Sequence, residues 1–100
     1  MNINKEVKDD VIVIKLDGRL DKLSSPVLDE ELKPVIAENK NITFDLEKLD
    51  YISSAGLRVL LSTKKTLKEN GKDISVINIG TDVMNILTVS GFVQLLGIKQ

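Results

Sequence analysis

The stretch that decides the fold is Leu49-Asp-Tyr-Ile-Ser-Ser-Ala-Gly-Leu-Arg-Val-Leu-Leu61. Upstream of its two serines, Ile42, Phe44 and Leu46 alternate with polar residues, which is the period of a half-buried strand and predicts one over 41–46. Downstream, the spacing is helical and predicts a helix over Ser54–Glu69, closed by Asn70-Gly71. The residues with this spacing are Leu57, Leu60, Leu61, Lys64 and Leu67.

A serine at a strand-to-helix junction has two interpretations. It is the preferred N-cap, because its hydroxyl accepts a hydrogen bond from an N–H group that has no helical partner. The same place favours an anion, so a phosphate on Ser53 or Ser54 would be well placed there. Gly56 in the first turn lowers the stability of the helix by roughly 1 kcal/mol relative to alanine. It indicates either close packing against a neighbouring strand or a bare surface that a partner can approach.

Length and composition bound the classes of protein that are possible. One hundred residues predict a single domain over 1–100, and 42% hydrophobic residues with 3% aromatics indicate an aliphatic core. With no cysteine there is no disulfide or Cys-based zinc site, and no apolar run approaches the ~20 residues of a membrane span. A net charge of −1 and few aromatics disfavour nucleic-acid binding. We therefore expect a cytoplasmic protein with no nucleic-acid or membrane partner, and a monomer by default.

The remaining pattern predicts an α/β domain of order β-β-α-β-α-β-α. An antiparallel hairpin is expected over 3–7 and 11–16 with its turn at Asp9-Asp10, followed by a loop over 17–21 and a helix that begins near Ser24-Ser25-Pro26. A strand over 73–78, a short helix after it and an apolar C-terminal segment with one more turn and a short strand complete the chain. Helices between strands imply parallel neighbours. We expect a mixed, mostly parallel sheet of four to five strands with helices packed against it.

The residues of this chain do not favour a catalytic function. The absence of histidine removes the usual general base and the usual metal ligand, and no glycine-rich phosphate loop occurs. We expect no catalytic residue, metal or cofactor. A small hydrolase that uses Ser54 with a lysine base stays open in principle.

Three segments resemble the STAS domain, specifically the stand-alone bacterial anti-sigma factor antagonists. Leu16-Asp-Gly-Arg-Leu-Asp21 is similar to the family's loop after the second strand. Phe44-Asp-Leu46 with Tyr51-Ile-Ser-Ser-Ala-Gly-Leu57 is similar to its signature strand and phosphoserine loop, and Val83-Met-Asn-Ile-Leu-Thr-Val-Ser-Gly-Phe92 to its third helix. The resemblance spans nearly the whole chain.

What the resemblance implies is a partner switch. The unphosphorylated antagonist would bind an anti-sigma factor that is also a serine kinase. That kinase would phosphorylate the serine two positions before the signature glycine, here Ser54, and a metal-dependent Ser/Thr phosphatase would reset the protein. Many family members have aspartate where this chain has Ser53, which leaves Ser53 as a second candidate acceptor. By matching motif positions, the partner surface would include Asp21, Ser53, Ser54, Gly56, Leu57 and Arg58.

Each of three of these residues also has a purely structural interpretation. Asp21 would simply cap a turn, Leu57 would belong to the core and Arg58 would be a solvated surface residue. For the whole chain, the alternative is a STAS module that acts as a non-switching scaffold or subunit of a signalling or transport assembly.

Overall fold

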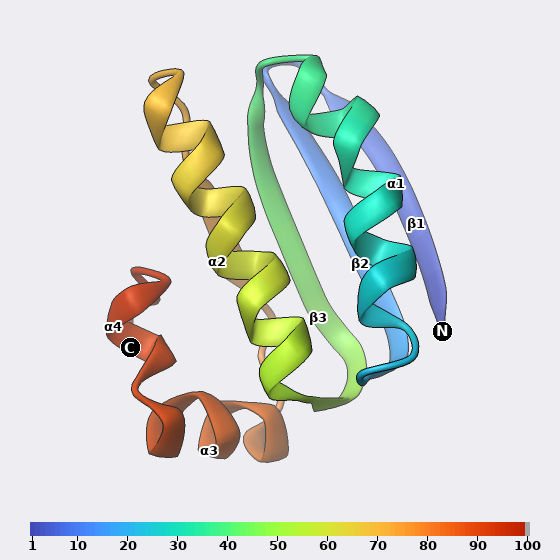
Figure 1. The fold of residues 1–100 in the computed structure, drawn as a ribbon, viewed down its shortest axis with the longest axis vertical. Coiled ribbons are helices and arrows are strands. Elements are labelled where there is room, and N and C mark those ends of the chain that lie inside the picture. The colour runs from blue at the N-terminus through green and yellow to red at the C-terminus, as the bar shows by residue number, and fades with distance from the viewer. Residues whose placement is uncertain (100) are drawn as a thin grey trace.

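A computed structural model describes residues 1–99 and shows an open four-stranded sheet with helices on one face (Figure 1). Its elements are β1 (Asn2–Lys8), β2 (Val11–Leu20), α1 (Ser25–Ala37), β3 (Asn41–Ile52), α2 (Ser54–Glu69), β4 (Ile74–Ile77), α3 (Thr81–Ser90) and α4 (Phe92–Leu95). The order in space equals the order in the chain: β1 pairs antiparallel with β2, which pairs parallel with β3, which pairs parallel with β4. The predicted mixed sheet and element order are confirmed, with four strands.

The core lies between the sheet and the helices α1 and α2. Along β2, buried Ile12, Ile14 and Leu16 alternate with side chains that are half-buried or exposed, so one face of the sheet is covered and the other faces solvent. The helices contribute a stripe of buried residues to this core. Its members are Leu28, Leu32 and Val35 from α1 and Leu57, Leu60 and Leu67 from α2. Each such side chain contributes about 1.5–3 kcal/mol relative to an exposed one.

The two central strands are longer than the sequence predicts, and this corrects the expected loop over 17–21. β2 continues to Leu20 because the chain forms a bulge: Gly18 adopts φ +113, and the register with β3 shifts on both sides of it. β3 continues to Ile52 opposite this extension, with Arg19 across from Tyr51. A glycine among charged residues predicts a loop, whereas here Gly18 lets the strand continue past the bulge.

The turns and the C-terminal segment follow the sequence closely. A two-residue turn joins Lys8 to Val11, with Asp9 at φ +51, and α2 has the predicted bounds with Asn70 as C-cap. After α3, Gly91 adopts φ +78, ends that helix and leads into the single turn of α4. The expected short terminal strand is absent from residues 1–99. In Figure 1, α3 and α4 lie on the opposite side of α2 from α1.

Candidate functional site

The two adjacent serines occupy different positions at the β3–α2 junction. Ser53 is the N-cap in extended conformation, and its Oγ accepts a hydrogen bond from the Gly56 N–H at 3.2 Å. Its backbone N–H donates to the Leu20 carbonyl at 2.8 Å, which ties the junction to the end of β2. Ser54 is the first residue of α2 and is exposed, and its hydroxyl bonds to no other residue within 1–99. One serine therefore holds the junction and the other presents a free hydroxyl.

Gly56 and Leu57, both expected on the partner surface, lie inward. A Cβ on Gly56 would lie 2.7 Å from Cγ of Leu20 and 3.0 Å from Cγ1 of Ile52, so close packing explains the glycine. The Leu57 side chain is 2% exposed and belongs to the core. Of the two open interpretations of each residue, the structure supports the packing one.

Asp21 organises the loop between β2 and α1. Its Oδ1 accepts hydrogen bonds from the backbone N–H groups of Ser24 at 2.9 Å and Leu23 at 3.0 Å, and its carbonyl accepts one from the Ser25 N–H at 2.9 Å. The bond from the Ser24 N–H is the main cause that holds the pKa of the Asp21 carboxyl below its usual range, with further bonds and Arg19 acting in the same direction. The carboxylate is thus occupied in shaping the loop, as the turn-capping interpretation expected.

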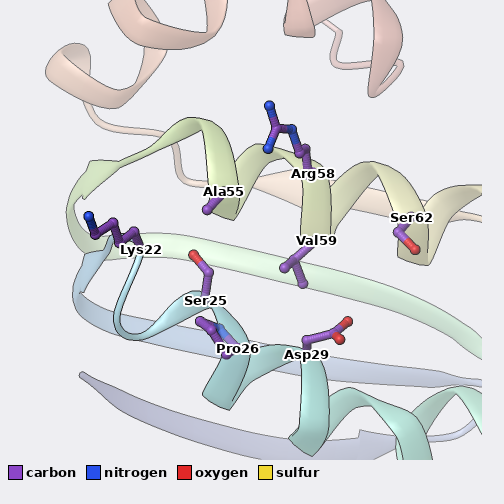
Figure 2. A pocket seen from close by; sticks show the side chains of 8 residues that line it. All are labelled: Lys22, Ser25, Pro26, Asp29, Ala55, Arg58, Val59 and Ser62. Atoms are coloured by element: carbon purple, nitrogen blue, oxygen red, sulfur yellow. The ribbon is translucent and has the colours of Figure 1, made fainter.

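A shallow groove of about 400 Å³ separates the first turns of α1 and α2 (Figure 2). Its lining residues are Lys22, Ser25, Pro26, Asp29, Ala55, Arg58, Val59 and Ser62. Ala55, which follows Ser54 in α2, lines this groove, so the groove begins in the same first turn of the helix that carries the free hydroxyl. In Figure 2, Val59 points from α2 toward α1, whereas Arg58 extends from α2 on the side away from α1.

Cations surround this end of the molecule. Lys22 and Arg58 are exposed and form no ion pair within the described part of the chain. The Arg19 guanidinium lies over the Tyr51 ring, 4.4 Å from its centroid. Arg58 is predicted from the family motif, whereas Arg19 is not, because its place beside Tyr51 depends on the extension of β2. Lys22 lies in the loop after this strand, and no sequence signal singles it out.

The arrangement is suited to presenting a hydroxyl to another protein. Among residues 1–99, no lysine side chain donates a hydrogen bond to the Ser54 hydroxyl. In the same residues, no group of three or more histidine, cysteine or acidic side chains is arranged to hold a metal ion. None of the helices in this part of the chain is long and apolar enough to cross a membrane.

Comparisons with known proteins show the family by sequence and the fold by structure. A family model described as the STAS domain matches residues 2–100. The anti-sigma-B factor antagonist of Bacillus subtilis (strain 168) is 29% identical over 101 residues, covering 99% of this chain and 93% of the relative. The crystal structure of an anti-sigma factor antagonist from Mycobacterium paratuberculosis aligns with a TM-score of 0.82 at 23% identity, over 97% of this chain and 83% of the other. The Bacillus cell fate determinant SpoIIAA in its phosphorylated form aligns with a TM-score of 0.73 at 19% identity, over 99% and 92%.

Proposed function

This chain belongs to the STAS domain family, and we propose that it is an anti-sigma factor antagonist in a partner-switching pathway. In this proposal the unphosphorylated protein binds a serine-kinase anti-sigma factor, phosphate on Ser54 blocks that binding, and a metal-dependent Ser/Thr phosphatase restores it. The names of the relatives support the antagonist role. The protein would act in the cytoplasm as a non-enzymatic monomer without a cofactor.

One observation carries the choice of acceptor. The Ser53 hydroxyl is engaged as the N-cap, whereas the Ser54 hydroxyl is exposed at the end of the same helix. A kinase must bring a hydroxyl into its own active site, so the free and exposed group is the better substrate. Modifying Ser53 would instead remove a cap worth about 1 kcal/mol.

The position also explains how a phosphate would switch binding while the fold stays intact. A phosphate adds about −1.5 to −2 charge, which the N-terminus of α2 tolerates because its N–H groups favour an anion. In a complex, the same charge would be buried against the partner without compensation. Burying an uncompensated charge reduces the free energy of binding by about 2–5 kcal/mol, which weakens binding roughly 30-fold to several thousand-fold.

The test combines acceptor mapping with binding. The serine-kinase anti-sigma factor of the same organism is incubated with ATP and wild-type, Ser53→Ala or Ser54→Ala protein, and the phosphate is located by mass spectrometry. We expect Ser53→Ala to be modified at Ser54 and Ser54→Ala to stay unmodified. Ser54→Asp should lose binding while Ser54→Ala retains it. Equal binding of Ser54→Asp and wild type would instead favour a non-switching scaffold.

A further inference from the structure

An exposed apolar ridge stands at the first turn of α1. Leu23 is 80% exposed and Val27 is 55% exposed, and both line a hollow of about 470 Å³ together with Met1, Arg19 and Asp21. Neither residue belongs to the buried stripe of α1, so the fold of this chain does not need them to be apolar. Met1, 41% exposed, lines the same hollow, so three large apolar side chains gather there, and a contiguous exposed apolar patch is what marks a contact with another protein.

This ridge lies at the same end of the sheet as Ser54. The parallel strands β2 and β3 end at the same edge of the sheet, and the bond from the Ser53 N–H to the Leu20 carbonyl joins their two exits. Pro26, which precedes Val27 in the chain, lines the groove from α1, opposite Ala55 on α2 (Figure 2). A protein that covers Ser54 would therefore reach the ridge across a single groove.

The charges beside the ridge define what such a protein must present. Lys22, next to Leu23 in the chain, lines the groove from the loop before α1, and Arg58 lines it from α2 (Figure 2); neither forms an ion pair among residues 1–99. Asp29, the one acidic residue among those that line the groove, lies further along it, past Pro26, and the Asp21 carboxylate in the ridge's hollow already accepts the Leu23 and Ser24 N–H groups. A complementary surface is apolar at its centre and acidic where it meets the two cations.

We propose that Leu23 and Val27 insert into an apolar cleft of the anti-sigma factor, whose acidic rim faces Lys22 and Arg58. This inference rests on the proposed function, because the occupant is the partner assigned there. The proposed acidic rim also explains why phosphorylation would weaken binding. A phosphate on Ser54 would add negative charge at this end of the molecule and face the partner's carboxylates, so like charges would meet at the rim.

Asp21 is a positioning residue in this arrangement. Its carboxylate accepts the Leu23 N–H and so fixes the backbone from which that side chain projects. Asp21→Ala should weaken binding less than a change at Leu23 itself, and Asp21→Asn, whose amide oxygen can accept the same bonds, should recover part of the loss. A direct contact of the Asp21 charge with the partner would leave Asp21→Asn as weak as Asp21→Ala.

The experiment measures calorimetric binding of unphosphorylated variants to the anti-sigma factor. Leu23→Asp should raise Kd about 50-fold or more, as expected for a buried anchor of an interface. Val89→Asp, at a side chain that is 90% exposed on α3, is the matched control and should stay within about twofold. Both sites are exposed, so far-UV circular dichroism should match wild type.

Charge reversals test the rim. Arg58→Glu should weaken binding about tenfold and flatten its salt dependence, whereas Lys65→Glu, exposed on the same helix and outside the groove lining, should bind like wild type. The inference is overturned if Leu23→Asp binds like Val89→Asp, or if Arg58→Glu binds like Lys65→Glu, while Ser54→Asp still loses binding. If Ser54→Asp binds like wild type, the proposed function itself fails.

Discussion

Replacing Gly56 by alanine tests whether close packing sets the position of the serines. Gly56 is buried in the first turn of α2, two residues after Ser54, and a Cβ there would lie 2.7 and 2.9 Å from Cγ and Cδ2 of Leu20. It would also lie 3.0 Å from Cγ1 of Ile52. Leu20 is 0% exposed and Ile52 is 1% exposed, so neither can move into solvent. Either the start of α2 must lift away from the sheet or the core beneath it must shift.

The expected magnitude comes from two opposing terms. Alanine in place of glycine favours a helix by about 1 kcal/mol. Overpacking a rigid core costs about 1–3 kcal/mol, and overlap with two fully buried side chains places this site in the upper part of that range. The net result is a loss of about 1–2 kcal/mol in the free energy of unfolding, which lowers Tm by roughly 4–16 °C for a domain of this size.

Urea unfolding followed by circular dichroism measures this loss. Gly80→Ala is the control, because Gly80 has an ordinary φ of −70 and no atom within 4 Å of the new methyl group. Its free energy of unfolding should change by less than about 0.5 kcal/mol, since reduced freedom of the unfolded chain offsets the poorer N-cap. If Gly56→Ala is as stable as wild type or more stable, close packing is not the reason for this glycine.

Three further predictions concern the junction and its loop. Ser53→Ala should lose about 1 kcal/mol of stability in urea because it removes the cap of α2, whereas Ser54→Ala should change it by less than about 0.5 kcal/mol; equal effects would mean that the hydroxyls do not have separate roles. Leu57→Ala should lose about 2–4 kcal/mol as a core residue, and a variant with wild-type stability but weakened partner binding would return Leu57 to the interface. The lowered pKa of the Asp21 carboxyl means that its contribution to stability is present above its unfolded value of about 3.9 and is lost as pH falls through the lower folded value. Amide chemical shifts of Leu23 should follow this titration in wild type and not in Asp21→Asn, and the same titration in both proteins would contradict it.

The sequence predicts the fold well because its periodicities are local. The alternation around Phe44 and the helical spacing after Ser54 each depend on a single element, and the structure confirms both. The extension of β2 and β3 was missed because it depends on a pairing between Arg19 and Tyr51 that the bulge at Gly18 makes possible. A glycine beside charged residues occurs both in loops and in bulged strands, so only the pairing with β3 distinguishes a strand from a loop here.

The sequence predicts the position of the candidate site, but the roles of its individual residues depend on the three-dimensional structure. Ser54 could be located from the strand-to-helix junction and from the family resemblance, and it is exposed as an acceptor must be. Which serine caps the helix depends on the backbone at the junction, and the inward position of Leu57 depends on the rotation of α2 about its axis. Leu23 lies outside the helical stripe, so no periodicity singles it out.

The most direct test of the switch uses protein with phosphoserine installed at position 54 alone. Calorimetric titration against the unmodified anti-sigma factor should show Kd raised about 30-fold or more relative to the unphosphorylated protein. Backbone amide shifts should change only around the start of α2 and the loop after β2, because the fold accommodates the charge. Equal affinity of the two forms, or loss of binding together with unfolding of the domain, would contradict the account.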